Sequence, residues 1–183
     1  CIRTQPFNTR QYNVYRHRRC EEVSNQDGYM CTINFMSNAI DYKQDYANLD
    51  VLAMHLKRCD SFFVPRLSDK VEIEAYAMKI FSYAVRFEAW RKQELIGLVA
   101  AYCNDKEKRT SYITNVSVLP EWQGQGVAAR LIDNCFVHLK FLGFEVLELE
   151  VDQRNQLAFS LYRKIGFKPA PKNKLSITMS IVL

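Results

Sequence analysis

Residues 111–152 constrain the fold of this chain more than any other feature, because they alternate between strand and helix patterns around two glycines. Residues 111–119 are rich in β-branched side chains, which favour a strand. Residues 127–143 place apolar side chains at helical spacing and end at Gly143, and residues 144–152 read as a second strand. A helix that connects two neighbouring strands pairs them in parallel. The sequence therefore predicts a βαβ unit.

The segment PEWQGQGVAARL, residues 120–131, lies between the first of these strands and the helix. In a βαβ unit it sits at the carboxyl end of the strand and at the helix N-terminus. Backbone N–H groups there have no intrahelical partners, and the helix dipole adds roughly half a positive charge. A phosphate suits such a place, and Gly124 and Gly126 allow close approach because they lack a Cβ. An ordinary glycine-containing loop explains the turn equally well.

The rest of residues 39–183 supplies more strands and helices. Residues 39–44 alternate like a strand, and a helix with Asn48 as its N-cap is predicted over residues 49–59. A second helix is predicted over residues 68–81, with Ser68 as its N-cap. Two strands, residues 83–91 and 95–103, are expected to pair as a hairpin. The last elements are a helix over residues 155–167, which Gly166 ends, and a strand over residues 175–183. This order predicts a mixed α/β domain.

Composition narrows the class of protein. The 183 residues are 48% hydrophobic, which is enough for one compact core. Residues 1–36 are basic and show no periodic pattern, so we interpret them as a segment appended to a domain of residues 37–183. Without a run of about 18 apolar residues or an apolar signal segment, we expect no membrane contact and a cytoplasmic location. A net charge of +5 is too weak to indicate nucleic acid. Six cysteines without C-x-x-C spacing argue against a metal site.

Two nucleotide-binding motifs compete for the glycine turn. Gly124, Gly126 and Ala129 satisfy the dinucleotide fingerprint G-x-G-x-x-G/A. Only 54 residues follow Ala129, however, too few for the remainder of a doubly wound dinucleotide domain. A phosphate loop of the NTPase type is a poorer match, because no Lys-Ser/Thr pair follows the glycines.

A third match covers much more of the chain. Gln123, Gly126 and Ala128 fit the pattern Q/R-x-x-G-x-G/A, and the segment NQLAFSLYRKIGF carries Asn155, Ala158, Tyr162, Gly166 and Phe167. Together these motifs resemble the GNAT superfamily of N-acetyltransferases. The resemblance implies an α/β fold with a mixed, mostly antiparallel sheet of about six to seven strands, flanked by helices and diverging at the acyl-CoA site.

The resemblance also implies roles for individual residues. Acetyl-CoA is the expected co-substrate, with its pantetheine arm between strands 111–119 and 145–152, along the backbone of Val116 and Val118. The Val118 N–H would stabilise the oxyanion, and Tyr162 would protonate the departing thiolate. Asn155 would bind the pantetheine arm or cap its helix. The pyrophosphate would be held by the turn, with Arg130 or Lys164 reaching outer phosphates; the turn residues are Gln123, Gly124, Gln125, Gly126, Val127 and Ala128.

No general base follows from the motifs. Many members of the superfamily place Glu on the strand before the glycine turn, where this chain has Asn115 and Ser117, which favours a water relay. Glu72, Glu74 and Glu88 are open alternatives for which a surface position is the simpler expectation. The three histidines, His17, His55 and His138, are given no catalytic role, and Cys135 is expected to be a packed thiol rather than a nucleophile.

The resemblance leads us to expect direct transfer of an acetyl group to a primary amine of a small molecule or a peptide, in a monomer or homodimer. A domain that binds acyl-CoA without turnover, as a sensor or interaction module, is the alternative. Dispensability of Tyr162 would distinguish that alternative from an enzyme.

Overall fold

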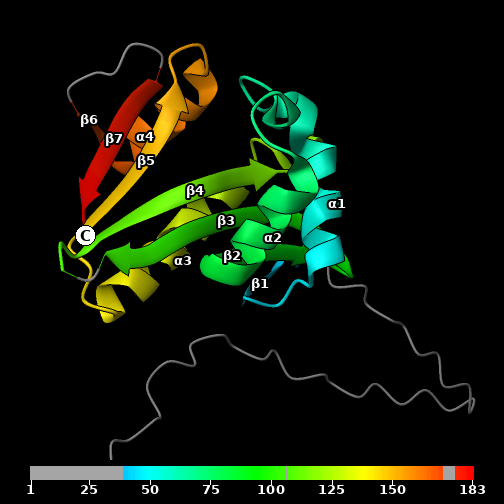
Figure 1. Cartoon of the computed structure of the whole chain (residues 1–183), viewed down its shortest axis with the longest axis horizontal. Helices are drawn as coiled ribbons and strands as arrows, with labels where there is room; N and C mark the ends of the chain where they lie inside the picture. The colour runs from blue at the N-terminus through cyan, green and yellow to red at the C-terminus, as the bar shows by residue number, and fades with distance from the viewer. Residues whose placement is uncertain (1–38, 106, 171–175) are drawn as a thin grey trace, which may run out of the picture. The chain divides into compact units, whose positions relative to one another are not determined.

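The computed structural model describes residues 39–105, 107–170 and 176–183, which form a seven-stranded sheet in the order β1-β2-β3-β4-β5-β7-β6 (Figure 1). Only β4 and β5 pair in parallel, and the other neighbours are antiparallel. A doubly wound dinucleotide domain is therefore excluded, and the mixed, mostly antiparallel sheet is confirmed. The strands are β1 Asp41–Gln44, β2 Val85–Arg91, β3 Glu94–Asp105, β4 Thr110–Val118, β5 Val146–Asp152, β6 Lys168–Pro169 and β7 Ser176–Val182.

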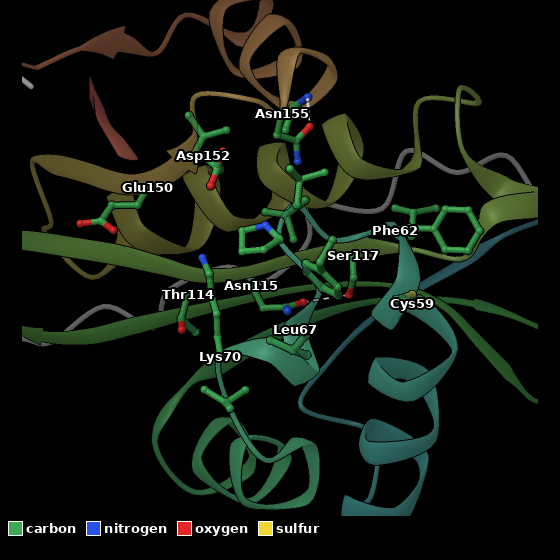
Figure 2. Close-up of a pocket in the computed structure, with 18 of the residues that line it drawn as sticks. Cys59, Phe62, Leu67, Lys70, Thr114, Asn115, Ser117, Glu150, Asp152 and Asn155 are labelled. Atoms are coloured by element: carbon green, nitrogen blue, oxygen red, sulfur yellow. Dashed lines mark hydrogen bonds between the residues drawn. The ribbon is translucent and has the colours of Figure 1, made fainter. Parts of the chain in front are cut away.

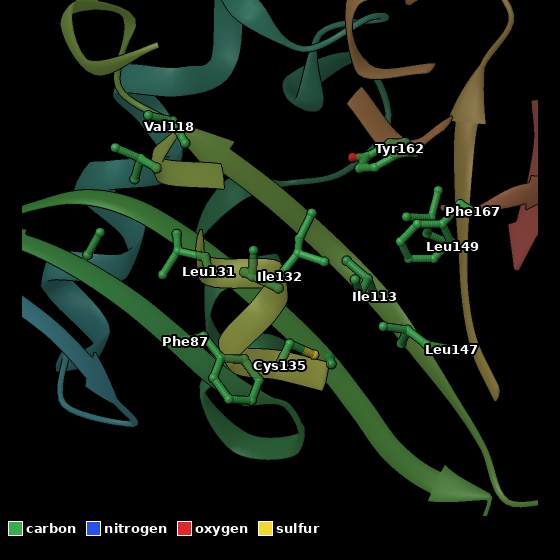
Figure 3. Close-up of a cluster of buried hydrophobic side chains, with 14 of the residues drawn as sticks. Phe87, Ile113, Val118, Leu131, Ile132, Cys135, Leu147, Leu149, Tyr162 and Phe167 are labelled. Carbon is green, nitrogen blue, oxygen red and sulfur yellow. The ribbon is translucent and has the colours of Figure 1, made fainter. Parts of the chain in front are cut away.

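Helices cover both faces of the sheet (Figure 1). The α-helices are α1 Leu49–Cys59, α2 Ile73–Tyr83, α3 Val127–Phe141 and α4 Gln156–Ile165, and the 3-10 helices are η1 Asp60–Phe62, η2 Leu67–Asp69 and η3 Pro120–Trp122. Helices α1 and α2 pack with Leu98 and Ala100 of β3 in one buried cluster. Helix α3 packs with Val99 and Ala101, on the opposite side of the same strand, in a second cluster that includes Tyr162 of α4 (Figure 3).

Most predicted elements are present, with two differences. Helix α1 begins after Asn48, whose side chain accepts from Val51 N at 2.9 Å. The prediction that Ser68 caps the next helix is wrong: its hydroxyl and N–H both donate to Asp60, and Glu72 caps α2 instead. The short strand β6 lies between the last predicted helix and the last predicted strand, where the sequence analysis predicts no element. Residues 1–38 lie outside the described residues, so the division at residue 36 stays a prediction.

Strands β4 and β5 separate after four paired residues. Thr110–Ile113 pair with Val146–Leu149, and no pairing continues beyond Ile113 and Leu149. On the other side of β4, Ala100 pairs with Asn115 and Ala101 with Ile113, so Thr114 is an extra residue in the strand. Such a bulge bends a strand and increases its local twist. The predicted divergence of these strands is thereby confirmed, and Figure 1 shows β4 and β5 splayed apart.

Helix α3 approaches β3 closely at Gly97. A Cβ at this position would lie 2.9 Å from Val127 Cγ1 and 3.1 Å from Leu131 Cδ1. The missing side chain lets the first turn of α3 rest directly on the sheet. The helix N-terminus is thereby held beside the end of β4, where the glycine turn begins.

Candidate active site

A pocket of about 350 Å³ opens where β4 and β5 separate (Figure 2). It is lined by residues of β4, β5 and α4 and by the segment that joins α1 to α2. Residues predicted for the site from three parts of the sequence meet in this lining: Val116, Val118, Gln123, Asn155 and Tyr162.

The backbone of Val118 faces the gap between the strands. Leu119 N–H donates to Ile96 O at 2.9 Å, so these two residues form a hydrogen-bonded pair of the antiparallel ladder. The next pair, Val118 with Gly97, is then a non-hydrogen-bonded pair whose backbone groups point away from each other. Gln123 Nε2 donates to Val118 O at 3.0 Å, which agrees with this direction. By the same alternation, the backbone of Val116 also faces the gap.

The glycine turn borders the pocket rather than lining it. Apart from Gln123, its predicted residues Gly124, Gln125, Gly126, Val127 and Ala128 are absent from the lining. Gly124 and Gly126 have φ angles of +72° and +80°, in the left-handed region that glycine tolerates best. Gly126 immediately precedes α3, so the N–H groups of the first helical turn project at this end. A Cβ on either glycine would meet no protein atom within 4 Å.

Two polar side chains at the pocket are fixed by the backbone. Gln123 is held by its bond to Val118 O. Asn155 caps α4, because its Oδ1 accepts from Ala158 N at 3.1 Å. The capping role is thus observed, and it leaves the side-chain NH2 group of Asn155 for another partner.

Tyr162 lies at the inner wall of the pocket and is 7% exposed. Its ring packs against Phe167 with 5.9 Å between ring centroids. Burial, with a smaller contribution from nearby Tyr112, raises the pKa of the Tyr162 phenol above its usual value of 10. The phenol therefore keeps its hydrogen at neutral and mildly alkaline pH, as a proton donor must.

None of the glutamates considered as a base lines the pocket. Glu88 is fully buried, where it accepts from Ala47 N at 2.9 Å and from Trp90 Nε1 at 3.0 Å. Glu72 caps α2, and Glu74 forms an exposed ion pair with Lys57. Cys135 is a core residue with a raised thiol pKa, as expected for a packed thiol.

His55 is the residue whose position the sequence analysis missed. It is 3% exposed, and its Nε2 lies 2.9 Å from Oγ of the pocket residue Ser117. The signal was present in the sequence, because His55 belongs to an otherwise apolar row with Leu52, Leu56 and Cys59 on α1. A polar side chain in a buried row needs a hydrogen-bond partner.

The lining of the pocket combines aromatic and charged groups from the α1–α2 segment and from β5. Phe62 lies at one end, and Lys70 approaches Glu150 and Asp152 at the other (Figure 2). Arg154 binds both carboxylate oxygens of Asp152 and lowers the pKa of that carboxyl to about 2. Arg130 and Lys164, the candidates for outer phosphates, are both exposed.

Among the residues that the structure describes, no group of three or more His, Cys, Asp or Glu side chains could hold a metal ion. No helix in that part of the chain is long and apolar enough to cross a membrane.

Comparison with known proteins decides the family. The model of the acetyltransferase (GNAT) family matches residues 51–167, which is more than half of the chain. The chain belongs to the GNAT family. The expectation that the chain is an acyltransferase is thereby confirmed.

The GNAT domain is similar to two curated relatives. It is 25% identical over 115 residues to N-alpha-acetyltransferase MAK3 of Arabidopsis thaliana, covering 62% of this chain and 60% of the relative. It is 24% identical over 88 residues to L-2,4-diaminobutyric acid acetyltransferase of Vibrio cholerae, covering 48% of this chain and 51% of that protein. The chain thus spans 60% of the Arabidopsis relative's length and 51% of the Vibrio relative's length.

Among solved structures, the GNAT domain resembles PaiA N-acetyltransferase from Thermoplasma acidophilum, determined in complex with coenzyme A. The TM-score is 0.65 at 16% identity, and the match covers 79% of this chain and 99% of the other. The expected GNAT fold is confirmed.

Proposed function

We propose that this GNAT domain transfers an acetyl group from acetyl-CoA to a primary amine by direct attack. The observation that carries the proposal is the pocket between β4 and β5, which brings together the backbone of Val118 and the phenol of Tyr162. The reaction needs a hydrogen-bond donor for the thioester carbonyl and a proton donor for the leaving thiolate, and water can take the proton of the amine. Coenzyme A in the related PaiA structure supports the choice of co-substrate.

The residues around the pocket fit the parts of acetyl-CoA. Backbone groups of Val116 and Val118 that point away from β3 can bind the pantetheine amides as a strand would. The NH2 group of Asn155 can donate to a pantetheine carbonyl. The turn from Gln123 to Ala128, at the N-terminus of α3, offers N–H groups and a favourable dipole to the pyrophosphate. Arg130 and Lys164 are proposed contacts for outer phosphates.

In the proposed reaction, Val118 N–H donates to the thioester carbonyl oxygen as the amine attacks the carbon. The attacking nitrogen loses a proton to water, and the C–S bond breaks as the carbonyl re-forms. Tyr162 gives its hydrogen to the sulfur of coenzyme A, and the tyrosinate then takes up a proton from water. The phenol can supply this hydrogen because it is protonated at neutral pH even at its usual pKa of 10, and burial raises that pKa further. No acyl-enzyme is needed, because amine and thioester meet in one pocket.

The acceptor is proposed to be an amine of a peptide or of a small molecule. The Arabidopsis relative is named for acetylation of α-amino groups and the Vibrio relative for a diamino acid. Both are primary amines. We propose a monomer or homodimer that acts without nucleic acid or membrane.

The test is isothermal titration with acetyl-CoA, with NAD as control, followed by thiol release in the presence of amines. The panel consists of 1,4-diaminobutane, 2,4-diaminobutyrate and peptides with a free α-amino group. Amine-dependent thiol release supports the transferase. Tight binding of acetyl-CoA with no release by any amine instead supports the acyl-CoA sensor.

A further inference from the structure

A chain of buried polar side chains leads from the core to the pocket. His55, Ser117 and Asn115 are 3%, 6% and 3% exposed. His55 Nδ1 lies 2.9 Å from Leu95 O, His55 Nε2 lies 2.9 Å from Ser117 Oγ, and Ser117 Oγ lies 2.8 Å from the side-chain amide of Asn115. Ser117 and Asn115 also line the pocket, whereas His55 does not (Figure 2). The pocket wall is therefore connected to a histidine that substrates cannot reach.

The direction of each hydrogen bond in this chain follows from the donors available. Leu95 O can only accept, so His55 Nδ1 carries a hydrogen. Burial lowers the pKa of His55 to about 4, which makes the ring neutral at pH 7 and leaves Nε2 as an acceptor. Ser117 must then donate its single hydrogen to Nε2. The thiol of Cys59, at 3.7 Å from the same nitrogen, is a weaker and more distant donor.

The same reasoning fixes the amide of Asn115. Because the Ser117 hydrogen is used by His55, Asn115 can bind Ser117 only as a donor, through its NH2 group. The structure places Asn115 Oδ1 at 2.8 Å from Ser117 Oγ. A 180° turn of the amide exchanges its oxygen and nitrogen and brings the NH2 group to Ser117 instead. Ser117 Oγ then donates one hydrogen bond and accepts one, and it retains a second lone pair, for which the weakly donating thiol of Cys59 is the one competing protein group among the described residues. Its hydrogen is directed to His55 and away from the pocket.

We infer that Ser117 binds the amino group of the acceptor through this lone pair, and that His55 is the positioning residue that holds Ser117 in the accepting orientation. An attacking amine must donate its hydrogens to the protein and keep its own lone pair for the thioester carbon. A serine free to rotate can instead donate to that nitrogen lone pair and block the attack. Ser117 directly precedes Val118, the proposed contact of the thioester carbonyl, so the two binding groups are adjacent in β4.

The first test measures steady-state kinetics of Ser117→Ala with the panel amine that wild type uses best. The KM for the amine is expected to rise about tenfold, as for loss of one hydrogen bond, while the Kd for acetyl-CoA stays at the wild-type value. Ser111→Ala is the matched control, because Ser111 is a buried serine of the same strand that lies outside the pocket lining and bonds to Val146 O. Its KM should be unchanged.

The second test separates positioning from a structural role. His55→Gln can donate to Ser117 as well as accept, so the hydroxyl is released to turn toward the pocket. We expect a rise of about threefold in the KM for the amine, and no further rise when His55→Gln is added to Ser117→Ala, because the two residues act in series. Additive effects of the two substitutions would overturn the inference.

The third test needs no turnover. Nitrogen-15 NMR of the wild-type domain at pH 7 should show His55 as the neutral tautomer with its hydrogen on Nδ1. An imidazolium or a hydrogen on Nε2 would overturn the inference. The inference rests on the proposed function, but the failures differ: no wild-type turnover with any amine refutes both, whereas wild-type turnover with an unchanged KM in Ser117→Ala refutes this inference alone.

Discussion

The two glycines that flank helix α3 allow a matched test of the phosphate site. Gly126 precedes the helix with φ +80°, and Gly143 follows it with φ +81°. A Cβ added to either would meet no atom within 4 Å. Gly126→Ala and Gly143→Ala should therefore carry the same backbone penalty, since an alanine in the left-handed region costs roughly 1–2 kcal/mol. Restriction of the unfolded chain offsets part of this cost.

The expected net loss of stability is about 1 kcal/mol for each variant, which corresponds to a fall in Tm of about 3 °C for a domain of this size. Only Gly126→Ala should also weaken acetyl-CoA binding, because its methyl group occupies the space in front of the N-terminal N–H groups. Loss of one charge-assisted hydrogen bond, about 1.5–3 kcal/mol, raises the Kd by roughly 10- to 150-fold.

The assay combines thermal unfolding of both variants with calorimetric titration of acetyl-CoA. Equal losses of Tm with a raised Kd in Gly126→Ala alone would support the phosphate site. If both variants bind acetyl-CoA as tightly as wild type, the reasoning about this turn is refuted.

Three further predictions follow from the structure. Tyr162→Phe should lower kcat by about 100-fold or more without changing the Kd for acetyl-CoA; unchanged kcat in the thiol-release assay would remove Tyr162 from the mechanism. Gly97→Ala should destabilise the domain by about 1–3 kcal/mol in chemical unfolding, because its Cβ would lie 2.9 Å from Val127 Cγ1. A Gly97→Ala variant as stable as the wild-type domain would contradict the close approach of α3 to β3. The free energy of unfolding should fall by up to about 3 kcal/mol as the pH decreases from 6.5 to 4. The reason is that His55 binds a proton in the unfolded chain over this range, whereas in the folded domain its pKa is lowered to about 4. A His55→Gln variant that retains this pH dependence would refute the attribution to His55.

The sequence predicted the parts of this domain that depend on local patterns. Strand and helix periodicity, the cap at Asn48 and the glycine that ends α3 are properties of neighbouring residues, and the structure has all of them. The family assignment followed from two short motifs in the correct order. The roles given to Tyr162, Val118 and the turn residues stay predictions, because they concern contacts with a substrate.

The features that the sequence did not predict depend on contacts between different helices and strands. Serine is a common helix N-cap, but the Ser68 hydroxyl donates to Asp60, and the helix starts at Ile73 with Glu72 as its cap. The bulge at Thr114 appears only when β4 is aligned with β3. His55 was considered alone, although its partner Ser117 is 62 positions away in the chain. In each case the deciding contact joins two different elements, and the spacing of residues within one element carries no information about it.

The most direct test of the central claim is amine-dependent release of coenzyme A thiol by the wild-type domain, compared with Tyr162→Phe at saturating acetyl-CoA. Release that requires an amine and falls by about 100-fold or more in the variant is the predicted result. Acetyl-CoA that binds but releases no thiol with any amine, or release that is equal in both proteins, would contradict the proposed transferase mechanism.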